Sequence, residues 1–349
     1  MGGGVHCQNG ASPTIENCVF AGNQAKTGGG FSCIGGSPTL VGCTFVGNHA
    51  YELDGGALLC TDGATPTIRD CLFLDNTTVA GGAGIGSFSS QVEISGCTFA
   101  GNASSPYAGG GALYCGWGST VRATNCTFVG NSSPDGAGVL CYPDGTLYLD
   151  NSIIAFSTVG RAIALYGSST ATLSCCDLYG NPGGDWVGAI AGQLGVSGNI
   201  AADPLFCDLL QGDYHLQPGS PCLPHTPPNP ACDLAGAWPL GCSTQGLAER
   251  APVGIPLSIE PSWVRAGGEP ARVVFELPAQ AGPQRVHVAL YDSSGRLVSL
   301  LVDGVRDPGR HELEWPAGGE RGARVPSGLY YCRLTAAGTG VARPLIVLR

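Results

Sequence analysis

The sequence predicts an all-β protein, in which a parallel β-helix, or solenoid, is followed by a small β-sandwich. The first observation is a glycine motif, Gly109-Gly110-Gly111-Ala112-Leu113-Tyr114-Cys115, which recurs with small changes in the first half of the chain. The second is a Phe-x-x-Asn motif, as in Phe128 to Asn131, which alternates with the glycine motif. The third is a set of β-like segments with sandwich-like spacing after residue 256.

The repeat has the length of one solenoid turn. The last position of each glycine motif, usually a cysteine, recurs at steps of 25 to 28 residues. A second ladder, which begins at Cys18, recurs at steps of 24 to 29 residues. Short β-rich segments with this period, and without the 3.6-residue periodicity of helices, are typical of a parallel β-helix. The sequence therefore predicts about seven stacked rungs within residues 1–185.

Alternation within the repeat predicts which side chains face the core. Apolar residues two positions before the first cysteine ladder should point inward, and so should cysteine and phenylalanine in the third strand, as in Cys43 and Phe45. The apolar residues of the second strand lie at an odd offset from the second ladder, which predicts a bend. Asparagine tolerates a left-handed backbone and can hydrogen-bond to copies of itself along a stack. The expected asparagine ladder is Asn23, Asn48, Asn76, Asn102, Asn131 and Asn181.

Most of the 17 cysteines belong to the two ladders. Equivalent Cβ atoms on stacked strands lie nearly 5 Å apart, which is wider than a disulfide prefers. We therefore expect the ladder cysteines to be buried free thiols that act as small apolar fillers. Cys175 is different because it flanks the ladder residue Cys176 and should point out of the core. The sequence contains no Cys-x-x-Cys pair, so a zinc site has little support.

The paired motifs Gly-Gly-Ala-(Leu/Ile/Val) and Phe-x-x-Asn resemble the repeats of chlamydial polymorphic outer membrane proteins. More widely, they are similar to the right-handed parallel β-helices of bacterial surface proteins and of pectate-lyase-like enzymes. This resemblance covers residues 1–185 and implies a right-handed solenoid. It is specific for the fold and says little about function.

Residues 186–245 are predicted to cap the open end of the coil. The series Asp203-Pro204-Leu205-Phe206, Asp213-Tyr214-His215-Leu216 and Gly219-Ser220-Pro221 resembles the capping segment of bacterial secreted β-helices. This loop-rich region has little core of its own, so disulfides are plausible. Four cysteines allow three pairings, and the sequence does not choose between them. The candidates are Cys207, Cys222, Cys232 and Cys242.

Residues 246–255 are predicted to be a linker, and residues 256–349 a separate domain. The runs from Tyr291 to Val298, from Gly309 to Trp315 and from Ser327 to Leu334 resemble the immunoglobulin-like domain of flagellar hook-assembly proteins. They are also similar to the C-terminal sorting domains of type IX secretion cargo. The resemblance implies an Ig-like sorting or anchoring domain whose partner is secretion machinery.

Charge and hydropathy exclude several function classes. Residues 1–250 hold five Arg or Lys against 17 Asp or Glu, whereas residues 251–349 hold eleven against nine. Basic residues are not clustered, so nucleic acid is not an expected partner. No apolar run reaches about 18 residues, so no transmembrane segment is predicted. The N-terminus begins inside a glycine motif and lacks the regions of a signal peptide, which suggests the loss of an upstream part.

The outer face beside the first cysteine ladder is the candidate binding surface. It has no carboxylate cluster, because Asp62 and Asp144 lie more than two rungs apart. Calcium binding and acid–base catalysis need such clusters, so no catalytic residue, metal site or cofactor is predicted. Exposed aromatic rings on a stiff surface can stack against sugars. The candidate binding residues are Tyr114, Trp117 and Tyr142, unless a loop or the C-terminal domain covers them.

Two functions remain. The first is a non-enzymatic β-helix, secreted or displayed at the cell surface, that serves adhesion by contacting a carbohydrate or a surface protein. The second is a polysaccharide-active enzyme, a lyase or hydrolase, whose catalytic rungs lie in a missing N-terminal part. The absence of a carboxylate cluster favours the first function and predicts that this chain does not cleave pectin. The resemblance to secreted and surface proteins implies an extracellular or cell-surface location.

Overall fold

The computed structural model contains two compact units, Met1–Cys207 with Tyr214–Cys242, and Asp208–Asp213 with Ser243–Arg349. The predicted linker, residues 246–255, lies outside the described residues. The structure describes residues 2–105, 109–209, 212–242, 257–261, 263–265, 269–278, 282–292, 297–316, 325–326, 328–336 and 339–348.

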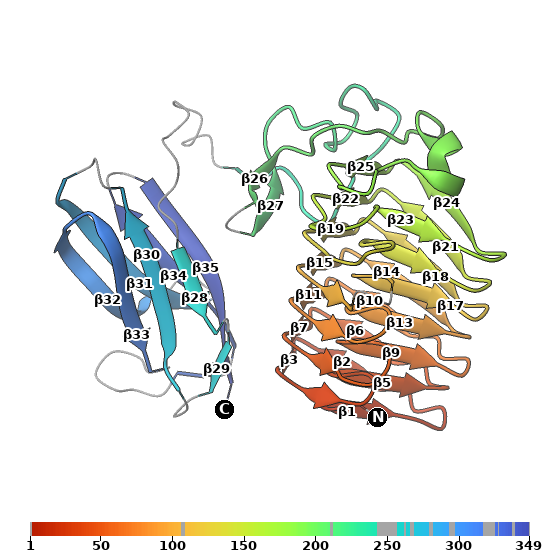
Figure 1. Ribbon diagram of the computed structural model, residues 1–349, viewed down its shortest axis with the longest axis horizontal. Coiled ribbons are helices and arrows are strands. Elements are labelled where there is room, and N and C mark those ends of the chain that lie inside the picture. Colours follow the sequence, from red (N-terminus) through yellow and green to blue (C-terminus); the bar gives the residue numbers. More distant parts are fainter. Residues whose placement is uncertain are drawn as a thin grey trace. The chain divides into compact units, whose positions relative to one another are not determined.

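The first unit is a right-handed parallel β-helix, as the sequence predicts (Figure 1). Three seven-stranded sheets form its sides, a four-stranded sheet joins them, and the strands pair in parallel register from rung to rung. The first sheet contains β1 (Val5–Cys7), β5 (Phe31–Ile34), β9 (Leu58–Thr61), β13 (Ile85–Phe88), β17 (Leu113–Gly116), β20 (Val139–Cys141) and β23 (Ile163–Leu165). The second contains β2 (Thr14–Glu16), β6 (Thr39–Val41), β10 (Thr67–Arg69), β14 (Gln91–Ser95), β18 (Thr120–Thr124), β21 (Thr146–Asp150) and β24 (Thr170–Ser174). The third contains β3 (Val19–Ala21), β7 (Thr44–Val46), β11 (Leu72–Leu74), β15 (Thr98–Ala100), β19 (Thr127–Val129), β22 (Ile153–Ala155) and β25 (Asp177–Tyr179), and the fourth contains β4 (Gln24–Ala25), β8 (His49–Ala50), β12 (Thr77–Thr78) and β16 (Ala103–Ser104).

Two columns of identical side chains fill the third side of the coil. Stacked phenylalanine rings lie 4.5 to 4.9 Å apart between centroids, with interplanar angles of 2 to 5°. Beside them, the Asn48 amide donates to Asn76 Oδ1 at 2.9 Å and to the Phe20 carbonyl at 2.8 Å. The same pattern continues through Asn102 and Asn131, which confirms the predicted asparagine ladder as far as Asn131. Ser157 interrupts it in the next rung, where its N–H donates to Asn181 Oδ1 at 3.2 Å.

In every rung, the predicted bend before the third strand is formed by a residue with a left-handed backbone conformation. The residue immediately before the second-ladder position has a φ angle between 45 and 62° in each rung. Glycine, asparagine and aspartate occupy most of these positions because they tolerate this region. Cys175 takes this conformation in the last rung, with φ of 52°. The ladder cysteines are free and buried as expected, except for Cys18, which is exposed in the first rung.

Thiol labelling should therefore distinguish Cys18 from the rest of the ladder. Burial raises the pKa of the Cys126 and Cys176 thiols to about 12, so little reactive thiolate forms at neutral pH. We expect maleimide to modify Cys18 rapidly in the native protein, and Cys43, Cys71 and Cys126 only after denaturation. Peptide mass spectrometry would measure this, and rapid native labelling of those three would contradict the inward assignment.

The cap covers the last rung, and its side chains form hydrogen bonds to the backbone groups that a further strand would otherwise pair. It includes the 3₁₀ helix η1 (Gly188–Gln193) and the paired strands β26 (Phe206–Asp208) and β27 (Asp213–Leu216). The Gln193 amide accepts from Leu173 N–H and donates to the Ala171 carbonyl, both at 2.9 Å. These bonds satisfy groups of β24 that an open sheet edge would leave unpaired.

Two disulfides hold the cap, and they use three of the four candidate cysteines together with Cys175. Cys207 is bonded to Cys242, but Cys232 is bonded to Cys175. Cys222 is a buried free thiol 3.2 Å from Asp177 Oδ2, so its place among the candidate disulfide cysteines was wrong. The bend turns Cys175 outward, as predicted, and the cap brings Cys232 to it.

The second unit contains two β-sheets around one core. Val273 and Phe275 from one sheet pack with Val288 and Leu334 from the other, and Trp315 is also buried. The pairs are antiparallel except for β29 with β35. One sheet contains β28 (Leu257–Glu260), β30 (Ala271–Leu277) and β33 (Gly309–Trp315), and the other contains β29 (Trp263–Arg265), β35 (Thr339–Leu348), β34 (Gly328–Ala336), β31 (Gln284–Asp292) and β32 (Leu297–Arg306). The described part of the chain has no helix with the length and hydrophobicity that a membrane span needs.

Candidate functional site

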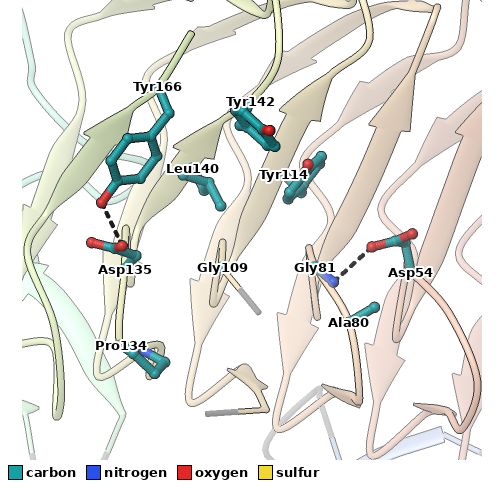
Figure 2. A pocket seen from close by; sticks show the side chains of 10 residues that line it. All are labelled: Asp54, Ala80, Gly81, Gly109, Tyr114, Pro134, Asp135, Leu140, Tyr142 and Tyr166. Atoms are coloured by element: carbon teal, nitrogen blue, oxygen red, sulfur yellow. Dashed lines mark hydrogen bonds between the residues drawn. The ribbon is translucent and has the colours of Figure 1, made fainter. Parts of the chain in front are cut away.

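A groove of about 470 Å³ lies on the outer side of the first sheet (Figure 2). It extends across several rungs, with aromatic residues on its strand side and a carboxylate near each end. The residues that line it are Asp54, Ala80, Gly81, Gly109, Tyr114, Pro134, Asp135, Leu140, Tyr142 and Tyr166.

The base of the groove is formed by equivalent backbone positions of four successive rungs, which stack along the coil axis. Asp54, Gly81, Gly109 and Asp135 occupy equivalent positions in successive rungs, where each carbonyl accepts a bond of 3.1 to 3.3 Å from a glycine N–H of the preceding rung. Three strand spacings place the two aspartates about 14 Å apart. A Cβ atom on Gly81 would overlap the Tyr114 ring, and one on Gly109 would overlap Leu140. Because both positions are glycine, the side chains of Tyr114 and Leu140 can occupy this space.

Three tyrosines form the aromatic side of the groove. Tyr114 comes from β17, and Tyr142 and Tyr166 follow β20 and β23. The Tyr114 ring stacks on Phe88 with centroids 5.1 Å apart. Tyr142 meets Tyr166 edge to face at 6.4 Å, and their exposed fractions are 49% and 39%. The row of tyrosines therefore follows the coil axis, and the rings of Tyr142 and Tyr166 are open to solvent.

Trp117 lies in the turn after β17 and is the most exposed of these aromatics, at 63%. Its backbone is left-handed, with φ of 55°, and its N–H donates to the Pro143 carbonyl at 2.6 Å. Other rungs place Asn9 and Asp62 in left-handed conformations at this turn. A bulky residue is costly there, and strained residues cluster at functional sites. Trp117 is not part of the groove lining but lies beside the turn that carries Tyr142.

The two carboxylates have different partners. Asp135 accepts a hydrogen bond of 2.5 Å from the Tyr166 hydroxyl and forms an ion pair of 3.0 Å with Arg161. The bond to Asp135 raises the pKa of Tyr166. Asp54 accepts a bond of 2.7 Å from Gly81 N–H, and burial raises its pKa. No basic side chain within the described residues forms an ion pair with Asp54.

The groove geometry suits binding of an extended ligand more than acid–base cleavage. Glycosidases that use two carboxylates hold them within about 10 Å of each other, closer than Asp54 and Asp135. Asp62 and Asp144 occupy left-handed turns, each with φ of 56°, and neither lines the groove. In the described ranges no three His, Cys, Asp or Glu side chains gather as metal ligands would.

The structure brings Tyr114 and Tyr142 into one site and places Trp117 next to it. Loops partly cover this face, since Leu59 and Leu140 are 7% and 6% exposed although they point away from the lumen. Asp54, Asp135 and Tyr166 are site residues that the sequence pattern did not predict. The available signal was that both aspartates immediately precede a glycine motif, at Gly55 and Gly136.

Comparison with known proteins supports both parts of this architecture. Residues 1–154 match the right-handed beta helix region family, and residues 261–340 match the FlgD Ig-like domain. The protein is therefore a β-helix repeat protein. More particularly, it combines a right-handed β-helix with a C-terminal Ig-like domain of the FlgD type.

Dimeric latent PorU from Porphyromonas gingivalis is 24% identical over a match that covers 28% of this chain and 10% of that chain, with a TM-score of 0.23. This chain thus spans about a tenth of that protein, and the match carries no argument about function. No curated protein matches the chain.

Proposed function

We propose that this chain is a non-enzymatic β-helix protein, secreted or displayed at the cell surface, that binds a glycan through the groove and its aromatic row. The observation that carries the proposal is Trp117, a largely exposed aromatic residue in a backbone conformation that disfavours it. Folding alone gives no reason for tryptophan at this turn. Contact with a ligand does, because an indole ring offers a large flat surface for a sugar ring.

The arrangement of the other residues agrees with an extended carbohydrate. Tyr142 and Tyr166 present partly exposed rings on neighbouring rungs, so a chain of sugars that follows the coil axis could contact them in turn. Carboxylates such as Asp54 accept hydrogen bonds from hydroxyl groups. The parallel sheets keep these groups at regular intervals without any ordering of loops on binding, which favours affinity.

An oxidising location is supported by the two disulfides of the cap, Cys175–Cys232 and Cys207–Cys242. In this proposal the β-helix serves adhesion, and the Ig-like domain serves export or anchoring with secretion machinery as its partner. The groove carboxylates give no support to a hydrolase that uses a carboxylate pair, since they are too far apart to act as one.

Replacing Trp117 with asparagine should weaken glycan binding while it stabilises the fold. Asparagine adopts the left-handed conformation more easily, so the free energy of unfolding should rise by about 1 kcal/mol. Loss of the indole should reduce retention on immobilised polysaccharides by about tenfold. Urea denaturation and affinity electrophoresis would measure the two effects.

A matched control is Tyr148→Ala, which removes a partly exposed ring from the second sheet, where it packs against Arg122. This variant should keep the binding of the unchanged protein. If Trp117→Asn retained every tested glycan as well as the unchanged protein, the proposed contact between Trp117 and the glycan, which carries the proposal, would be wrong. If the unchanged protein released shortened products from those glycans, the non-enzymatic proposal would be wrong.

A further inference from the structure

Asp54 is a partly buried carboxylate whose charge lacks a cationic partner within the described residues. One oxygen accepts from Gly81 N–H at 2.7 Å, and Figure 2 shows the carboxylate near one end of the groove. At the other end, Asp135 is already bonded to Arg161 and Tyr166. The two ends of the groove therefore differ in the charge that a ligand would meet.

The surroundings of Asp54 favour a positive charge. Burial raises the pKa of the nearby Tyr114 hydroxyl to about 12, and the negative charge of Asp54 adds to this effect. Tyr114 is therefore neutral at physiological pH and can present the negative face of its ring to a cation. An aromatic ring beside a carboxylate is a suitable environment for an ammonium group. The charge of the whole unit agrees, since Met1–Cys207 and Tyr214–Cys242 hold 14 acidic residues against four basic ones.

We propose that the groove selects a glycan that contains a free amino sugar, with the protonated amine bound at Asp54 and Tyr114. The following sugar units extend along the coil axis toward Tyr142 and Asp135. This inference rests on the proposed glycan binding and names its ligand class. It also excludes a class: uronic acid chains, as in pectin, would bring their carboxylates against Asp54 and Asp135.

Calorimetric titration with defined oligosaccharides would test the proposal on the full chain. The probes are a glucosamine oligomer, its N-acetylated counterpart and a galacturonate oligomer of equal length. A charge-assisted hydrogen bond is worth about tenfold or more in affinity. We expect the glucosamine oligomer to bind at least about tenfold more tightly than the N-acetylated one, and galacturonate not to bind.

Asp54→Asn supplies the decisive variant, because the amide oxygen can still accept from Gly81 N–H and so preserve the loop. This variant should bind the glucosamine oligomer and its N-acetylated counterpart with about equal affinity. Asp144→Asn, in an exposed turn outside the groove, should keep the original preference. Thermal unfolding would establish that both variants are folded.

The remaining outcomes separate this inference from the proposed function. Equal binding of both glucosamine probes by the unchanged protein would overturn the amine site and leave glycan binding intact. If the unchanged protein bound none of the probes and no other polysaccharide, both proposals would be wrong. Tighter binding of a lysine oligopeptide than of the glucosamine oligomer would assign the ammonium site to a protein partner and overturn the inference.

Discussion

Replacing Asn76 with alanine is expected to lower the free energy of unfolding by about 4 kcal/mol. Asn76 Oδ1 accepts from the backbone N–H of Asn48 at 3.0 Å and from its side-chain amide at 2.9 Å. Asn76 Nδ2 donates to the Phe45 carbonyl at 3.0 Å and to Asn102 Oδ1 at 2.9 Å. All of these groups are buried, and each one left unpaired costs about 1 to 3 kcal/mol. Urea denaturation would measure the loss.

Asn23→Ala is the matched control because Asn23 stands at the first position of the same ladder. Its side chain donates to Asn48 Oδ1 at 2.9 Å and is only half-buried. The expected loss is about 1 kcal/mol, since only this side-chain bond is removed and Asn48 Oδ1 still accepts from the Asn23 backbone N–H at 3.1 Å. Equal losses at the two positions would mean that the ladder does not stabilise the coil through its buried bonds.

The repeat architecture could be predicted from sequence because each rung repeats the same physical requirements. Phe45 and Phe73 occupy the same register position and stack with their planes 2° apart. An inward phenylalanine, an asparagine at the turn and a small apolar cysteine therefore recur in most rungs, with Ser152, Ile154 and Ser157 as departures in one rung. A fault in one rung would disturb its neighbours, which is why the pattern remains visible over long stretches.

The cap could not be predicted at the same level because its contacts occur once. Cys232 reaches Cys175 only through the route of the loops after residue 186, and sequence separation does not encode that route. Trp238 illustrates the same point, since its indole N–H donates to Thr98 Oγ1 on β15, 140 residues away. Pairings of this kind depend on the tertiary path.

The candidate site was only half predictable for a related reason. Tyr114 and Tyr142 could be assigned outward from strand alternation, which is a local property. Asp54 and Asp135 precede glycine motifs, where aspartate is an ordinary turn residue. They become two ends of one groove only when the loops fold over the first sheet with Gly81 and Gly109 between them.

Replacing Asp177 with asparagine should remove a pH dependence from the stability of the capped end. Asp177 lies at the start of β25, is fully buried, and accepts from Ala202 N–H at 3.0 Å. Burial raises its pKa from 3.8 to about 7, with smaller contributions from the charges of Asp185 and Asp203. The bonds from Ala202 and from the Cys222 thiol lower it and offset only part of this effect.

The sign follows from the raised pKa. The folded protein holds this proton more tightly than the unfolded chain, so the stabilisation is complete below about pH 4 and is lost as the pH rises through 7. A change of about three pKa units corresponds to at most about 4 kcal/mol. Asparagine keeps an acceptor for Ala202 N–H and carries no charge. Above pH 7 the variant should therefore be more stable than the unchanged protein by up to about 4 kcal/mol.

Urea denaturation at pH 4, 5.5 and 8, without reductant, would test this difference, with Asp144→Asn as a control in an exposed turn. Comparison at each pH cancels the titration of the other carboxylates, which the two proteins share. The difference between Asp177→Asn and the unchanged protein should be small at pH 4 and large at pH 8. If it were the same at all three values, the ionisation of Asp177 would not control the capped end, and its burial would have to be compensated by a contact other than those with Ala202 and Cys222.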